Sequence, residues 1–326
     1  MKLAQFKFIF LYVLRNKWVQ AGTGLLVSSF LTILAIEKID WIEISTSLKA
    51  IPIHTLLIVL IPIALTMVLR AMRWYLLLPD ENIKFVDVLL IQNTGMGVNN
   101  ISPIRMISEP IQLALITKNY NVGFSKAFTG LVGGNFLDVI ASALVITVGV
   151  ALIPSLRDQA ISIPILGAFI LFSFSTLVFI AIARGIHKLA FWGRFQYFQE
   201  VVNAANLLKD RPWNLALAFL ATLSHWVVLG LAGWILMSSF GMEISLVAMT
   251  VILVAATFFT AAIPSAPTGM GTFHFAVTTM LVALGENHSI AFGFSIVMHL
   301  FTVLPSSAIA LIMVWRLGAR AILERK

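Results

Sequence analysis

The chain has 326 residues, of which 60% are hydrophobic and only 11% are charged. A soluble domain averages roughly 25% charged residues, so this composition excludes an ordinary soluble enzyme. The net charge of +8 does not indicate nucleic acid, because the basic residues lie in connections between apolar runs. The absence of cysteine excludes disulfides and thiolate-bound metals. We therefore expect an all-α integral membrane protein.

Apolar runs follow one another along most of the chain. A membrane-spanning helix needs about 20 predominantly apolar residues. We interpret residues 1–17 as an interfacial basic segment, 18–315 as one polytopic helical domain and 316–326 as a basic cytoplasmic tail. About eight membrane segments are expected. A short amphipathic stretch lies at 111–120. The apolar runs are 18–36, 51–69, 85–101, 127–152, 161–183, 214–240, 245–263, 273–285 and 289–315.

The basic residues predict how the chain is oriented. They gather in the N-terminal segment, near Arg70 and Arg73, in the connection 184–211 and in the C-terminal tail. Lysine and arginine are enriched in cytoplasmic loops, so both termini are expected in the cytoplasm. Arg70 and Arg73 are expected to extend to the interface, next to lipid headgroups. Interfacial positions are also expected for the tryptophans at predicted run ends, namely Trp18, Trp41, Trp74, Trp213 and Trp315.

Two polar breaks, at residues 99–110 and 263–274, interrupt the apolar pattern. Non-helical backbone in hydrocarbon leaves polar groups unpaired unless protein or a wet cavity satisfies them, and such breaks are typical of transport sites. Run 273–285 would form only about 20 Å of helix, too short for a core of about 30 Å. One hypothesis is that 85–120 and 245–285 form opposed re-entrant hairpins, an inverted repeat with a site at the midplane. The alternative is that 273–285 spans.

The first break contains candidate headgroup ligands. Arg105 is the leading one, because a guanidinium fork suits a lipid phosphate. Glu109 either pairs with Arg105 or acts as a first-turn carboxylate behind an N-cap at Ser108. Asn99 and Asn100 either satisfy broken backbone or contact the headgroup.

The second break combines glycines, hydroxyls and a histidine. Gly269 and Gly271 permit positive φ and close backbone approach. Thr268 or Thr272 is expected to cap the next helix, whose N-terminus would face an anionic group. His274, in the first turn of that helix, is interpreted either as a structural residue or as one that titrates or contacts phosphate.

Ionisable residues deep in apolar runs are candidates for ion coupling. Asp138 is the clearest, because intramembrane acids face a bundle interior or a cavity. A structural pairing with Arg105 or with a lysine is the alternative. Glu109, His274 and His299 are further candidates. The sequence shows no P-loop and no HExxH spacing, so no cofactor or metal is expected.

These residues together resemble a known family, the membrane domain of lysylphosphatidylglycerol synthase/flippase proteins. The resemblance covers about residues 10–315 and rests on Arg73-Trp74, Asn99-Asn100 with Pro103, Arg105 and Glu109, Asp138, and Pro264-x-x-Pro267-x-Gly269-x-Gly271-Thr272-Phe273. It implies an eight-span, flippase-like protein of a prokaryotic cytoplasmic membrane that moves a polar lipid between leaflets.

The chain departs from the family pattern at several charged positions. His274 stands where the family often has glutamate, and His299 stands where an arginine is common. Gln112 replaces an expected arginine, and Gly134-Asn135 replaces a Glu-Arg pair. These departures leave the substrate and any ion coupling open. The sequence holds no soluble aminoacyl-transferase domain, so lysyl transfer is not expected.

Three functions remain open from the sequence. The first is a flippase that binds a phosphate or anionic headgroup at the midplane. The second is a non-transporting subunit that scaffolds a lipid or glycan synthesis complex. The third, an integral-membrane transferase, is disfavoured because no cluster of acids lies in a loop. The expected partners are membrane lipids of anionic or polyprenyl-phosphate type, with a homo-oligomer or a lipid-synthesis enzyme as alternatives and no nucleic acid.

Overall fold

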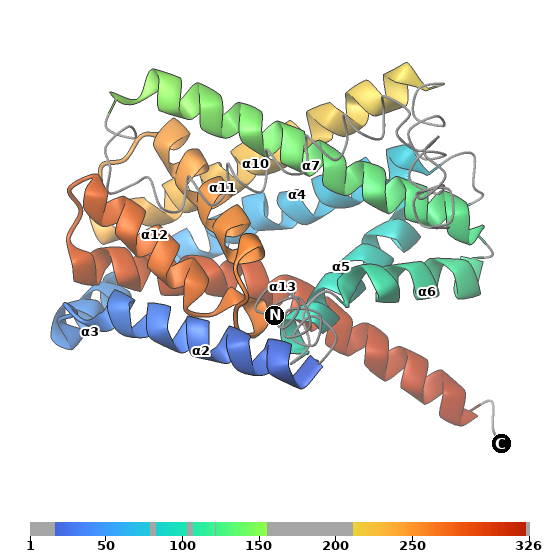
Figure 1. The fold of residues 1–326 in the computed structure, drawn as a ribbon, viewed down its shortest axis with the longest axis horizontal. Coiled ribbons are helices and arrows are strands. Elements are labelled where there is room, and N and C mark those ends of the chain that lie inside the picture. The colour runs from blue at the N-terminus through green and yellow to red at the C-terminus, as the bar shows by residue number, and fades with distance from the viewer. Residues whose placement is uncertain (1–16, 79–82, 103–106, 121, 155–210, 324–326) are drawn as a thin grey trace, which may run out of the picture.

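The chain folds into a bundle of helices (Figure 1). A computed structural model describes residues 17–78, 83–102, 107–120, 122–154 and 211–323, and all regular structure within them is helical. The α-helices are α2 (Lys17–Ile36), α3 (Trp41–Ala50), α4 (Ile53–Leu77), α5 (Phe85–Ile101), α6 (Ser108–Tyr120), α7 (Phe124–Leu152), α10 (Pro212–Met237), α11 (Leu246–Ala262), α12 (Thr272–Ala283) and α13 (His288–Leu323). Two 3₁₀ turns, η5 (Ser238–Phe240) and η6 (Pro267–Gly269), complete the order. The predicted all-α class is confirmed for the described part, whereas the predicted run 161–183 and segment 1–16 lie outside it.

Within the described residues, four helices are long and apolar enough to cross a membrane. They are Ile53–Leu77, Phe124–Leu152, Pro212–Phe240 and His288–Arg316. Apolar side chains project outward from all four, as Ile61, Val148, Leu220 and Leu311 do. Water does not stabilise so much exposed apolar surface, whereas lipid does. The chain is therefore a multi-pass membrane protein.

Helix α11 lies at the centre of the bundle. It packs against α10, α12 and α7, and most of its residues are buried, with Val251, Ile252 and Leu253 almost fully enclosed. A helix that is hydrophobic all round is stable only when other helices surround it. The core therefore holds α11 in place, and with it the second break, which begins where α11 ends.

Close helix contacts join α5 to α13 beside the first break. A side chain on Gly97 would collide with the backbone carbonyl of Ser306, so the two helices touch there. Asn100 Nδ2 donates to Ser306 Oγ at 3.1 Å and to the Val303 carbonyl at 3.4 Å. Small residues at such contacts allow helices to approach in a membrane. The end of α5 is therefore held firmly against α13.

Each polar break joins two helices that pack against each other. The first connects α5 to α6, and the second connects α11 to α12. Helix α12 has 12 residues, or about 18 Å, and is too short to cross a core of about 30 Å. The predicted breaks in the helical pattern are confirmed in position.

One of the tryptophans predicted at the membrane interface lies elsewhere. Trp41, Trp213 and Trp315 are exposed, and their interfacial position stays a prediction. Trp74 is only 1% exposed, and a Cβ on Gly130 of α7 would lie 3.1 Å from its Nε1. The interfacial position predicted for Trp74 is wrong, because that face of α4 packs onto α7.

Candidate functional site

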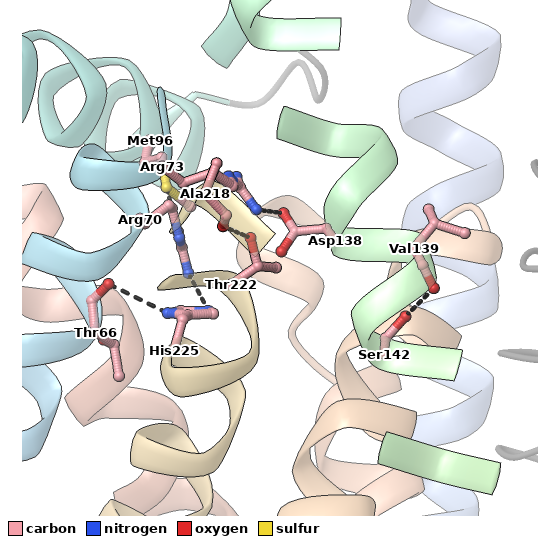
Figure 2. A network of polar contacts seen from close by, with 10 residues as sticks. All are labelled: Thr66, Arg70, Arg73, Met96, Asp138, Val139, Ser142, Ala218, Thr222 and His225. Carbon is pink, nitrogen blue, oxygen red and sulfur yellow. Dashed lines mark hydrogen bonds and ion pairs between the residues drawn. The ribbon is translucent and has the colours of Figure 1, made fainter. Parts of the chain in front are cut away.

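An ion pair between a buried arginine and a partly exposed aspartate connects α4 to α7. Arg73 Nη1 contacts Asp138 Oδ2, and the residue Arg73 is only 5% exposed. The predicted extension of Arg73 to the membrane interface is wrong, because its guanidinium turns into the bundle toward Asp138 (Figure 2). Asp138 was expected to pair, if at all, with Arg105 or a lysine; its partner is Arg73. The two residues are far apart in the sequence, and only the packing of α4 on α7 brings them together.

Gly134 makes room for this ion pair. It lies one turn before Asp138 on α7, and a Cβ at this position would be 3.1 Å from Arg73 Nε. A larger side chain would displace the guanidinium from the helix surface. Gly134, one of the departures from the family pattern, thus allows Arg73 to lie flat against α7.

Arg70, one helical turn before Arg73, contacts only uncharged groups. Its Nη1 contacts Met96 Sδ of α5, and its Nη2 lies 3.4 Å from His225 Nε2 of α10 (Figure 2). His225 Nδ1 lies 3.2 Å from the carbonyl of Thr66. A carbonyl only accepts, so Nδ1 carries hydrogen and Nε2 is the acceptor that faces Arg70. Among the described residues, no carboxylate lies within 4.0 Å of the Arg70 guanidinium.

We call Arg70, Arg73, Asp138 and His225 the arginine cluster. It contains two guanidinium groups and one carboxylate. Arg73 Nε and Asp138 Oδ1 are buried and make no hydrogen bond. A buried charge without a partner is costly, and buried polar atoms are normally paired. Within the described part of the chain, the cluster therefore has one more cation than anions and an unused donor, which is an arrangement that can hold an anionic group.

A second polar centre forms at the break between α11 and α12. Thr268 has φ 61°, and Gly269 and Gly271 also have positive φ, which turns the chain sharply between the two helices. The predicted capping by Thr268 or Thr272 is wrong, because Gly271 is the N-cap of α12 and no side chain caps it. Thr268 Oγ1 donates to the Pro267 carbonyl and Thr272 Oγ1 to that of Gly269, so both hydroxyls satisfy the break itself.

Helix α2 satisfies the backbone of the second break. Ser28 Oγ accepts a 2.7 Å hydrogen bond from the buried N–H of Ala266. A Cβ on Gly24 would lie 2.7 Å from the Ser265 carbonyl, and one on Gly271 would lie 2.5 Å from the Ser28 carbonyl. The polar groups that hydrocarbon cannot satisfy are thus paired by protein. Sequence reasoning missed Ser28, although Gly24, Ser28 and Thr32 form a visible stripe at intervals of four residues.

Two histidines that the sequence proposed separately form a hydrogen-bonded pair. His299 Nδ1 lies 3.1 Å from His274 Nε2, and His299 Nε2 lies 3.1 Å from the Thr268 carbonyl. The carbonyl requires a proton on His299 Nε2, so in a neutral pair His274 Nε2 donates to His299 Nδ1. Phe273 stacks on the His299 ring with centroids 5.0 Å apart. This chain of contacts ties α12 and α13 to the strained residue Thr268.

An asparagine side chain pairs with backbone in the described part of the first break. Asn99 Oδ1 accepts a hydrogen bond from the N–H of Ile107 at 3.2 Å, across the break. The expectation that an asparagine satisfies broken backbone is therefore confirmed at Asn99. Ser108 lies inside α6, and its hydroxyl accepts from Gln112 Nε2 at 2.7 Å, so the N-cap predicted at Ser108 is wrong. Glu109 lies in the first turn of α6, and Arg105 lies outside the described residues, so their pairing stays a prediction.

In comparisons with known proteins, the chain matches the model of one protein family. The family model described as "Lysylphosphatidylglycerol synthase TM region" matches residues 23–310. This range covers both breaks, the arginine cluster and the histidine pair. A search among curated proteins found no match.

Proposed function

The chain belongs to the lysylphosphatidylglycerol synthase transmembrane-region family, and from that premise we propose that it moves a polar, phosphate-bearing lipid between membrane leaflets. The membrane is proposed to be a prokaryotic cytoplasmic membrane, with both chain termini on the cytoplasmic side. The observation that carries the proposal is the arginine cluster inside the bundle. A cation that lies between packed helices without an ionic partner costs stability, and its presence therefore favours a role in binding an anion.

In this proposal the headgroup binds at the arginine cluster while the hydrocarbon tails remain in the bilayer. Arg70 is the principal ligand, because a phosphate oxygen is a stronger acceptor than a thioether sulfur or a neutral imidazole. Arg105, Asn99, Asn100 and Glu109 of the first break remain predicted ligands. Asp138 and the His274–His299 pair remain proposed sites of proton coupling.

The two broken helix pairs support an alternating-access route. We propose that α5–α6 and α11–α12 enter from opposite membrane faces as re-entrant hairpins, with Ser102 and Ser265 near the midplane. Short helices joined by satisfied, non-helical backbone are typical of inverted-repeat transporters.

This topology predicts restricted access to both breaks. The chain contains no cysteine, so a cysteine placed at Ser102 or at Ser265 will be the sole thiol. Membrane-impermeant maleimides are expected to label neither position, or to label it only through a cavity, whereas a cysteine at Glu286, in the turn after α12, should label readily. Free labelling of both break positions from the same bulk face would contradict the opposed-hairpin arrangement.

The function itself predicts that Arg70→Gln slows lipid movement. The expected result is at least a tenfold loss in the rate at which a fluorescent anionic lipid crosses the bilayer of proteoliposomes, because the headgroup loses its cationic ligand. Arg316→Gln is the matched control, since it removes the same charge from the exposed end of the α13 span. Equal rates in wild type and Arg70→Gln would overturn the site.

The alternative function, a non-transporting scaffold for a lipid or glycan synthesis complex, makes the opposite prediction. A scaffold tolerates Arg70→Gln and co-purifies with an enzyme. The Arg70 guanidinium, which has no carboxylate partner among the described residues, favours transport. A scaffold would have no need of a cation at this position.

A further inference from the structure

The arginine cluster carries one positive charge in excess, and this excess bears on the substrate. Resting on the proposed function, we infer that the transported lipid carries a single net negative charge in a phosphodiester headgroup. A cationic aminoacylated lipid and a lipid diphosphate are thereby excluded as preferred substrates. The site concerned is the one formed by Arg70, Arg73 and Asp138.

The charge count follows from the contacts. Both arginines are protonated, because guanidinium does not lose its proton in proteins. Arg73 and Asp138 form an ion pair, so their two charges cancel. His225 is neutral, because Nδ1 donates to Thr66 and a proton on Nε2 would face the Arg70 guanidinium. The cluster therefore has one positive charge more than it has negative charges.

The position of that excess charge identifies the group that cancels it. Arg73 is already paired with Asp138, whereas Arg70 is held by a thioether and an imidazole, both of which are uncharged. One phosphate oxygen can replace either contact, and the unused Nε of Arg73 is a further buried donor in the same cluster. The structure thus contains the donors for one anion at the face of α4.

The position of the cluster between packed helices makes the count selective. Charge pairs interact more strongly away from water, and an uncompensated charge is costly there. A phosphodiester brings the cluster to neutrality. An aminoacylated headgroup with a net positive charge adds a cation to a cationic site, and a diphosphate leaves negative charge without a partner. A zwitterionic headgroup does not neutralise the excess.

The test uses the full chain in nanodiscs of phosphatidylcholine doped with equal traces of phosphatidylglycerol, lysylphosphatidylglycerol and a polyprenyl diphosphate. Native mass spectrometry then measures which lipids the protein retains. Wild type is expected to enrich phosphatidylglycerol at least tenfold over both other trace lipids. Arg70→Gln, which removes the excess charge, is expected to abolish this enrichment. Arg316→Gln should keep it.

Two further variants change the charge without removing Arg70. Asp138→Asn raises the excess and is expected to shift retention toward the polyprenyl diphosphate by at least fivefold. The double variant Arg73→Gln/Asp138→Asn returns the excess to one and is expected to restore the preference for phosphatidylglycerol. Because the double variant lacks the ion pair, restored preference also shows that the single-variant result is not a folding defect.

The outcomes separate the single-charge inference from the proposed function. Retention of lysylphosphatidylglycerol that depends on Arg70 would overturn the single-charge inference and leave lipid transport standing. Bulk lipid retained equally by all variants, together with no lipid movement in proteoliposomes, would overturn both. Millimolar inorganic phosphate is expected not to displace phosphatidylglycerol; displacement would assign the site to a free anion instead of a lipid.

Discussion

Asp138→Ala is expected to destabilise the protein by about 3–5 kcal/mol, because it leaves Arg73 as a buried charge without a partner. Arg73 is nearly inaccessible, its Nε already lacks a hydrogen bond, and Asp138 is its only ion-pair partner among the described residues. The midpoint of thermal unfolding in detergent micelles measures the effect. A loss below about 1 kcal/mol would show that the pair is solvated, as surface pairs are.

The double variant Arg73→Met/Asp138→Leu is the control for this prediction. Replacing a buried ion pair by apolar residues of similar volume is often neutral or stabilising. We expect the double variant to unfold near the wild-type midpoint while lipid transport is impaired. That combination would assign the ion pair to the function of the protein instead of its stability.

Gly271→Ala is expected to be the most damaging small substitution in the second break. Gly271 has φ 84°, and an added Cβ would lie 2.5 Å from the Ser28 carbonyl and collide with the Thr32 hydroxyl. Two costs therefore add: a backbone conformation that disfavours side chains, about 1–3 kcal/mol, and the separation of α2 from the break. Loss of the bond between Ser28 and Ala266 follows, because α2 must move.

Gly285→Ala separates the two costs. Gly285 has φ 99°, and no atom lies within 4 Å of the position that an added Cβ would take. The control variant therefore shows the backbone strain alone. We expect Gly271→Ala to lower the thermal midpoint clearly further than Gly285→Ala; equal shifts would mean that α2 does not pack closely on the break.

The sequence was sufficient to predict the helical class, the long apolar runs in the described part and both breaks. Hydrophobic length determines these features locally, and α4, α7, α10 and α13 follow it closely. The short length of α12 was also visible, because polar residues bound it on both sides.

Contacts between helices could not be predicted in the same way. His274 and His299 were each proposed from their own surroundings, but their hydrogen bond depends on how α12 packs on α13. Arg73 was expected at the membrane surface because it ends an apolar run. Its burial depends on Gly134, which opens the face of α7 on which Arg73 lies. Such registers are set by tertiary packing, which a single sequence does not contain.

The bond between Ser28 and Ala266 has a consequence for biosynthesis. It joins residues 238 positions apart, so α2 enters the bilayer long before the backbone that it satisfies has been translated. Until then the second break cannot be completed, and long-range closure of this kind is slow. The early helix must therefore remain available while the intervening helices insert, which makes the second break one of the last parts of the protein to assemble.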